Sequence, residues 1–166
     1  MAETKLHGNT IRTNGTLPKV GERAPDFTLT TTDLKDVSLA DFKSRAKLIS
    51  IFPSIDTPVC ALSTKKFNDH ARANPDVTMM MVAADLPFAM ARFCGDEGLE
   101  NVKALSMMRD RKFADDYGVR ITDGPLAGIT ARAVLVLDAD NVVTYAELVP
   151  EIGQEPDYDA AIKALA

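Results

Sequence analysis

The sequence predicts an α/β fold in which a central mixed sheet is flanked by helices. Two apolar runs, 47–52 and 76–85, have the continuous hydrophobic, β-rich character of strands buried on both faces. Segments with helical periodicity alternate with these runs, which favours parallel strands joined by helical crossovers. An alternating pattern at 131–149 then predicts an antiparallel hairpin, so the sheet is expected to contain both kinds of pairing.

The N-terminal region is expected to form a β-hairpin followed by a loop. Residues 1–17 hold two short alternating runs on either side of His7–Gly8–Asn9, where turn-forming residues gather. After the loop, the pattern predicts a strand from Phe27, a turn, and a brief helical turn from Ser38.

Strands and helices alternate through the middle of the chain. The patterns predict a strand at 47–52, a helix at 58–73, a strand at 76–85, a helix at 86–94, a short strand at 102–106 and a helix at 109–118. The hairpin, closed by an Asp/Asn turn, and a terminal helix at 157–166 follow. A parallel part followed by an antiparallel part is the order of a thioredoxin-like fold. No repeat or Gly/Ser-rich linker divides the chain, so residues 1–166 are expected to form one domain.

The composition is that of a globular protein. A chain of 166 residues, 46% hydrophobic and 26% charged, is long enough to bury a core of its own. The net charge of -5 argues against a general nucleic-acid binder. The polar N-terminal segment has no apolar signal region, and no run is long enough to cross a bilayer, so a soluble cytoplasmic protein is expected with no membrane partner.

The chain has two cysteines, Cys60 and Cys94, which are too few for a disulfide framework and match no short zinc motif in their spacing. Two histidines, His7 and His70, leave little material for a metal site, so no metal or cofactor is expected. His70 lies ten residues along the same predicted helix as Cys60, about 15 Å away at the usual rise. It therefore cannot act as the base of a cysteine hydrolase.

The segment DTPVC places Cys60 in the first turn of the predicted helix 58–73. Pro58 suits the first helical position, which makes Thr57 the N-cap and predicts that its side chain accepts a hydrogen bond from an N–H of the first turn. The helix N-terminus favours a thiolate at Cys60, whose sulfur is expected to be half sheltered on the sheet-facing stripe. Burial as a small hydrophobic side chain remains an equal interpretation on position alone.

A second thiol could come only from Cys94. Thr57 and Cys60 have the spacing of a redox CxxC, but with a hydroxyl in place of the first thiol. Cys94 ends the predicted helix 86–94, just before Gly95, which is expected to terminate it. Because helix ends fray, a thiol in this last turn can leave its packing and reach a partner.

Several segments resemble the peroxiredoxin family. FPSIDTPVCALSTKKFN meets the active-site pattern of that family with Pro53, Thr57 and Cys60. NGTLPKVGERAPDFTLTTTDL, ADLPFAMARFCGDEGLENV, DGPLAGITARAVLVLD and ELVPEIGQEPDYDAAIKAL are similar to its bacterial thiol peroxidase subfamily. The resemblance extends from about Gly8 to the C-terminus.

The resemblance implies a homodimeric antioxidant enzyme with a thioredoxin-like fold and an N-terminal hairpin. Cys60 would be the peroxidatic cysteine and Cys94 the resolving cysteine of an atypical two-cysteine cycle. Arg132 would be the active-site arginine, Pro53 would shield the sulfur from water, and Thr57 would bind the thiolate and the peroxide.

The implied reaction reduces hydrogen peroxide or organic hydroperoxides, and the subfamily resemblance favours alkyl hydroperoxides as substrates. The Cys60 sulfenic acid would condense with Cys94 to an intramolecular disulfide, which thioredoxin would reduce. Because bridged Cα atoms must lie within about 7 Å, two cysteines on different helices are expected to require local unfolding at both helix ends. A slow redox sensor, or a binding protein with inert cysteines, remains the alternative.

Overall fold

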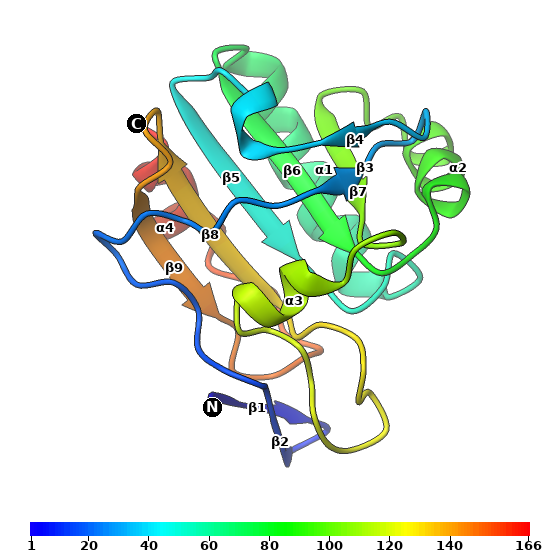
Figure 1. Cartoon of the computed structure of the whole chain (residues 1–166). Helices are drawn as coiled ribbons and strands as arrows, with labels where there is room; N and C mark the ends of the chain where they lie inside the picture. Colours follow the sequence, from blue (N-terminus) through cyan, green and yellow to red (C-terminus); the bar gives the residue numbers. More distant parts are fainter.

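The computed structural model describes residues 1–166 and is built around a seven-stranded mixed sheet (Figure 1). The strand order is β4-β3-β7-β6-β5-β8-β9, in which β5, β6 and β7 are parallel and the remaining neighbours are antiparallel. The strands are β3 (Leu29–Thr30), β4 (Asp36–Val37), β5 (Ala46–Ile51), β6 (Val77–Ala83), β7 (Val102–Ser106), β8 (Ala133–Asp138) and β9 (Val143–Leu148). The predicted thioredoxin-like arrangement with a central mixed sheet is confirmed.

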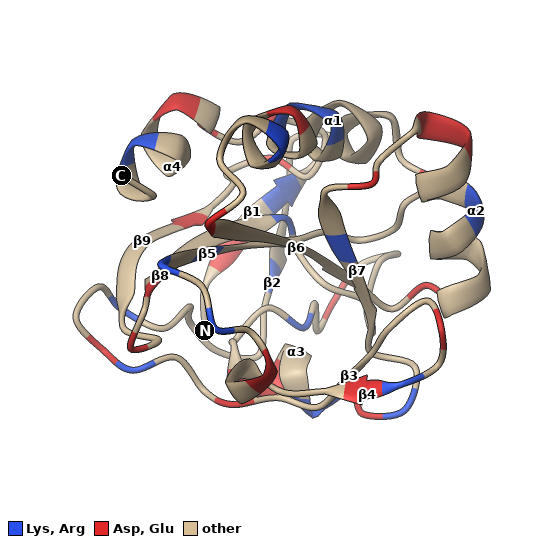
Figure 2. Cartoon of the chain, turned by 90° about the horizontal axis from the view of Figure 1, so that it is seen from above, with Lys and Arg blue, Asp and Glu red and all other residues tan.

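Helices cover both faces of the sheet (Figure 2). One face carries α1 (Pro58–Ala73), α2 (Pro87–Glu97) and α4 (Tyr158–Ala164), and the other carries α3 (Lys112–Asp116) and the 3₁₀ turn η1 (Leu39–Asp41). Every residue of β5 is buried, because Leu48 packs beneath α1 and α4 while Ile49 packs toward α3. This confirms the strand buried on both faces that the continuous apolar run predicted. No helix combines the length and apolar character needed to cross a membrane.

The N-terminal hairpin forms a separate two-stranded sheet, β1 (Glu3–Leu6) and β2 (Asn9–Arg12), below the main sheet in Figure 1. Its turn has positive φ at both His7 and Gly8, as a tight hairpin requires. Strand β1 also runs beside the segment that follows β9: the Lys5 N–H donates to the Pro150 carbonyl oxygen at 3.0 Å, and the Ile152 N–H donates to that of Lys5 at 2.8 Å. The hairpin thereby fixes the position of residues 150–152.

Helix α2 is longer than the pattern indicated. The prediction that it ends before Gly95 is wrong: α2 continues to Glu97, and Gly98 takes the left-handed conformation that terminates it, with φ of 65°. The Leu99 N–H donates to the Cys94 carbonyl oxygen at 2.9 Å, which is the bonding of a Schellman motif. Buried Leu99 stabilises this ending, since it packs in the same cluster as Cys94. Cys94 thus remains in the last turn.

Two further boundaries differ from the sequence prediction. The helix expected at 109–118 is reduced to α3, because the Asp110 side chain accepts the Lys112 N–H and Gly118 has positive φ. The turn after β3 closes onto a second short strand, β4, which the sequence did not predict. The shortened α3 lies on the face of the sheet opposite α1, whereas β4 forms one edge of the sheet (Figure 2).

Candidate active site

Cys60 lies in the first turn of α1, at the carboxyl-terminal end of β5. Pro58 occupies the first turn and Thr57 is the N-cap, as predicted. The Cys60 side chain is 1% exposed and packs in an apolar cluster formed by loop, strand and helix residues: Phe52, Ile55, Met81, Ala83, Met90, Phe93, Leu99 and Ala104. The sulfur is therefore fully buried, not half sheltered as the sequence indicated.

Arg132 directs its guanidinium at the Cys60 sulfur. Because β8 is antiparallel to β5 and Ala133 pairs with Ile51, Arg132 lies just beyond the end of β5. Its Nη1 lies 3.2 Å from Cys60 Sγ, its Nη2 lies 3.5 Å from Thr57 Oγ1, and its Nε donates to the Ile152 carbonyl oxygen at 2.8 Å. The residue is 3% exposed.

This buried arginine has no carboxylate partner, since every ion pair in the molecule joins other residues. A buried cation without a counter-ion is costly and favours an anion beside it. Of the three groups that it contacts, the Cys60 sulfur is the one that can become an anion at moderate pH. The arrangement therefore suits a thiolate, or an anionic oxygen of a molecule bound beside it.

Thr57 contacts the sulfur and does not cap the helix with its side chain. Its hydroxyl donates to the Ser54 carbonyl oxygen at 2.9 Å, and its oxygen lies 2.7 Å from Cys60 Sγ. The predicted side-chain N-cap bond is absent. The reason is that the hydroxyl points toward Ser54 and the sulfur, so the backbone carbonyl of Thr57 receives the Cys60 N–H instead, at 3.2 Å.

The environment of Cys60 acts on its pKa in two directions. Burial raises the pKa of the thiol, and this is the largest influence, while the Arg132 charge and the hydrogen bonds from Thr57 and Arg132 lower it. The net result is a pKa above the ordinary value. The prediction that the helix N-terminus favours a thiolate at Cys60 does not hold in the reduced fold, because burial of the sulfur raises the pKa by more than the positive groups beside it lower it.

The loop before α1 carries Pro53 and is fixed from two sides. Pro53 is buried directly after Phe52, whose carbonyl oxygen accepts the Thr130 hydroxyl at 2.8 Å. On the other side, the Asp85 carboxylate accepts the Ser54 hydroxyl at 2.9 Å. Sequence reasoning missed Thr130, Ser54 and Asp85. Asp85 ends the run 76–85 that was predicted to be a buried strand, and this position was the one signal that could have placed it at this edge of the sheet.

Cys94 lies on α2 as a half-buried free thiol. It packs against the same apolar cluster that contains Cys60, and no disulfide joins the two. Burial raises its pKa as well. The fold therefore brings both cysteines to one cluster, from the first turn of α1 and the last turn of α2, while both remain reduced.

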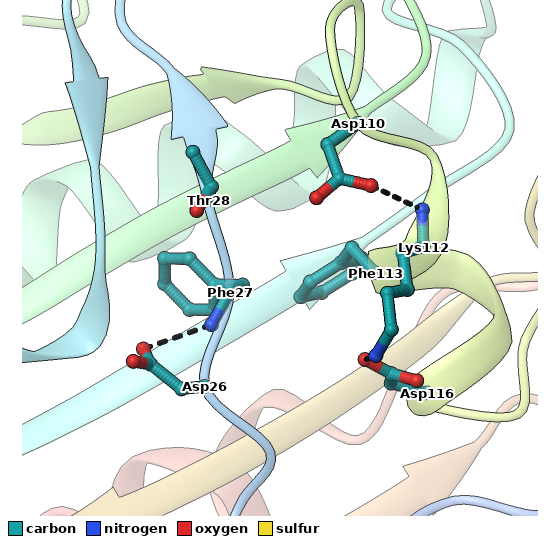
Figure 3. A pocket seen from close by; sticks show the side chains of 7 residues that line it. All are labelled: Asp26, Phe27, Thr28, Asp110, Lys112, Phe113 and Asp116. Carbon is teal, nitrogen blue, oxygen red and sulfur yellow. Dashed lines mark hydrogen bonds and ion pairs between the residues drawn. The ribbon is translucent and has the colours of Figure 1, made fainter.

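A separate hollow lies on the opposite face of the sheet (Figure 3). Its acidic groups already have partners: Asp26 accepts the Phe27 N–H, Asp110 accepts the Lys112 N–H, and Asp116 forms an ion pair with the Lys112 side chain. No group of three His, Cys, Asp or Glu side chains in the molecule could hold a metal ion. This hollow contributes nothing to the cysteine site.

The fold and site define a thiol enzyme with a thioredoxin-like sheet, in which a buried cysteine at a helix start faces an unpaired arginine. Residues 19–162 match the Redoxin family model, and the chain belongs to that family.

Curated relatives extend the likeness to the whole chain. Thiol peroxidases of Mycobacterium tuberculosis (strain H37Rv) and Mycobacterium bovis are 54% identical over 165 residues, covering 99% of this chain and 99% of theirs. At this identity the chain is an enzyme of the thiol peroxidase type.

Solved structures agree with this assignment. A peroxiredoxin-like protein from Aquifex aeolicus is 40% identical with a TM-score of 0.92, covering 99% of this chain and 96% of that one. A thiol peroxidase from Chromobacterium violaceum is 30% identical with a TM-score of 0.90, covering 98% of this chain and 94% of that one.

Proposed function

We propose that the enzyme reduces hydrogen peroxide and organic hydroperoxides through Cys60, resolves the oxidised sulfur with Cys94, and is recycled by thioredoxin. The observation that carries the peroxidatic role is the contact between Arg132 Nη1 and Cys60 Sγ, 3.2 Å apart, in a buried site without a carboxylate. A fixed guanidinium there favours the thiolate over the thiol and can bind the oxygens of a peroxide in its planar fork.

The first step forms a sulfur–oxygen bond. The Cys60 thiolate attacks one peroxide oxygen, the O–O bond breaks, and the leaving oxygen takes up a proton to depart as water or an alcohol. Arg132 stabilises the negative charge that moves onto the leaving oxygen. Thr57 keeps its oxygen beside the sulfur, and buried Pro53 excludes bulk water from the loop side. Cys60 becomes a sulfenic acid.

The second step joins the two cysteines. The Cys94 thiol attacks the Cys60 sulfenic sulfur, which forms an intramolecular disulfide and releases water. In the reduced fold each cysteine sits within an ordered helix, so the first turn of α1 and the last turn of α2 must open for the bridge to form. Thioredoxin then reduces the disulfide by dithiol exchange and returns both residues to the thiol state.

A homodimer and a cytoplasmic location belong to the same proposal. Leu62 on α1 and Leu86 and Phe88 at the start of α2 are large apolar side chains that stay 53%, 52% and 65% exposed. Their burial against a second copy would remove this apolar surface from water. Sedimentation of the reduced protein tests the dimer.

The cycle is tested by intact mass under non-reducing conditions after one equivalent of hydroperoxide, followed by mapping of the cysteine peptides. A loss of two hydrogens with Cys60 joined to Cys94 within one chain is the expected result. Unmodified thiols would contradict the peroxidatic role of Cys60. An oxygen adduct that persists on Cys60 would leave that role in place and remove Cys94 from the cycle, and Cys94→Ser provides the matched reference for that species.

A further inference from the structure

Asp85 holds the loop that precedes the reactive cysteine. It is the second residue after the end of β6, at the same edge of the sheet as the start of α1. One carboxylate oxygen accepts the Ser54 hydroxyl at 2.9 Å, and the other accepts the Ile55 N–H at 3.1 Å. No Lys, Arg or His pairs with this carboxylate. Its hydrogen bonds are therefore directed to the loop alone.

Ser54 transmits this restraint to Thr57. Its carbonyl oxygen accepts the Thr57 hydroxyl at 2.9 Å and the Thr57 N–H at 3.3 Å, and its own hydroxyl oxygen accepts the Asp56 N–H at 3.2 Å. The Thr57 oxygen in turn lies 2.7 Å from Cys60 Sγ. The Thr57 hydroxyl has one proton, which goes to the Ser54 carbonyl while Cys60 is a thiol and can turn to the sulfur when Cys60 is a thiolate. Asp85, through Ser54, thus holds this donor beside the sulfur.

The base of this chain is rigid. The backbone carbonyl of Asp85 accepts the hydroxyl of Ser106, a buried residue at the end of β7. Asp85 is therefore tied to the carboxyl ends of two neighbouring strands, β6 and β7, while its side chain reaches the loop after a third, β5. The sheet can in this way set the position of Thr57 against the sulfur.

We propose that Asp85 is a positioning residue, which keeps the Thr57 hydroxyl in contact with the Cys60 sulfur through Ser54. The proposal rests on the peroxidase function for its effect on rate, but its effect on the thiol stands apart from that function. Arg132 is the charged side chain that contacts the Cys60 sulfur, whereas the Asp85 carboxylate contacts the loop at Ser54 and Ile55. The route from Asp85 to the sulfur is therefore the hydrogen-bonded loop, and Asp85→Asn tests it separately from the charge.

The primary test compares Asp85→Ala with Asp26→Ala. Asp26 is the control, because its carboxylate also holds loop backbone, accepting the N–H groups of Phe27 at 2.8 Å and Leu39 at 3.1 Å on the opposite face of the sheet, although it is more exposed than Asp85. The measurements are the pH profile of alkylation at the Cys60 peptide and the rate of Cys60 oxidation by hydroperoxide. Asp85→Ala is expected to raise the alkylation midpoint and to slow oxidation about tenfold, while Asp26→Ala leaves both unchanged.

Two further variants separate contact from charge and from general stability. Asp85→Asn is expected to stay within about threefold of the wild type, because its amide can still accept the Ile55 N–H and donate to the Ser54 oxygen. Thr57→Val removes the hydroxyl, so adding Asp85→Ala to it should cost no further rate. If Asp85→Ala fails to fold, Ser54→Ala breaks the same chain from the loop side and should slow oxidation in the same direction.

The outcomes are distinguishable. The positioning role would be overturned if Asp85→Ala had the alkylation profile and oxidation rate of the wild type. It would also be overturned if Asp85→Ala slowed oxidation equally in the wild type and in Thr57→Val, or if Asp85→Asn were as slow as Asp85→Ala. If the wild-type enzyme fails to reduce hydroperoxide, the proposed function fails, and the alkylation midpoints of the same variants still decide whether Asp85 acts on Cys60.

Discussion

The guanidinium of Arg132 contacts the sulfur of Cys60, and both side chains are almost completely buried. Nη1 and Sγ are 3.2 Å apart, and Arg132 has no carboxylate partner. Burial alone would make the thiol a poor nucleophile, because the charged form is penalised in an apolar cluster. The arginine opposes that penalty with a positive charge placed where the negative charge has to form.

Replacement of Arg132 should therefore reduce the reactivity of the Cys60 sulfur more than the stability of the fold. Arg132→Met keeps most of the side-chain volume and removes the charge, so the pKa of Cys60 is expected to rise further above its ordinary value. The rate of Cys60 oxidation at neutral pH should fall about a hundredfold. Stopped-flow kinetics with hydroperoxide measures the rate, and Arg45→Met, which loses only a surface ion pair with Asp76, serves as control. Equal rates for the two variants would contradict this role.

The raised pKa of Cys60 predicts a definite dependence of stability on pH. The folded protein favours the neutral thiol, whereas the pKa of the unfolded thiol stays at its ordinary value of 9.0. Stabilisation is therefore complete below that value and is lost as pH rises toward the folded pKa, since only the unfolded state then loses its proton. Cys94 contributes in the same direction.

Urea denaturation between neutral and moderately alkaline pH measures this effect. The free energy of unfolding of the reduced wild type should decrease with pH more steeply than that of a Cys60→Ser/Cys94→Ser double variant. Parallel curves for the two proteins would show that the thiols do not have raised pKa values in the folded state.

The N-terminal hairpin should support the active-site arginine. Arg132 Nε donates to the Ile152 carbonyl oxygen at 2.8 Å, and Ile152 is held by β1 through its N–H bond to Lys5. Ile11 of the hairpin packs in one cluster with Ile152. Ile11→Ala is expected to loosen this contact, increase amide exchange at 150–152, and slow Cys60 oxidation about threefold.

A residue on the exposed side of the hairpin supplies the control for that prediction. Thr10 lies on the same strand, β2, and is exposed, so Thr10→Ala removes no packing against Ile152. If Ile11→Ala increased amide exchange at 150–152 but left the oxidation rate unchanged, the hairpin would not support Arg132 and the prediction would be wrong.

The sequence was sufficient for much of the fold because the relevant signals are local. Helix α1 spans 58–73 as predicted, since Pro58 and the apolar periodicity both mark its start. The end of α2 was misplaced because Gly95 and Gly98 are chemically the same, and only the packing of Leu99 decides which of them takes the left-handed conformation. Glycine by itself marks a candidate position for the end of a helix.

The site was less predictable because its contacts join distant segments. Arg132 and Cys60 are 72 positions apart, and their approach depends on the register of β8 against β5, which only the family resemblance could suggest. The raised pKa of Cys60 was missed for the same reason, since the burial that causes it comes from α2 and the sheet. Asp85 lies within a segment that resembles the family, but nothing in the pattern indicates a role for its carboxylate.

Gly95 in α2 and Gly98, which ends the helix, allow the stability of its last turn to be changed in opposite directions. Formation of the disulfide requires this turn to open. Gly98 has φ of 65°, so Gly98→Ala should strain the end of the helix and destabilise the protein by about 1 kcal/mol. Gly95 is helical with open space around its Cα, so Gly95→Ala should stabilise α2 by about 0.5–1 kcal/mol.

Cys94 lies in the last turn of α2, which Gly98→Ala should destabilise and Gly95→Ala should stabilise. Disulfide formation after Cys60 oxidation should therefore become faster in Gly98→Ala and slower in Gly95→Ala. Rapid-quench mass spectrometry, which follows the sulfenic acid and the disulfide separately, measures that step. The rate of the first oxidation should stay the same in both variants, since neither glycine contacts the sulfur of Cys60. Equal resolution rates in the two proteins would mean that the end of α2 does not limit the approach of Cys94, and that opening at the start of α1 controls the step instead.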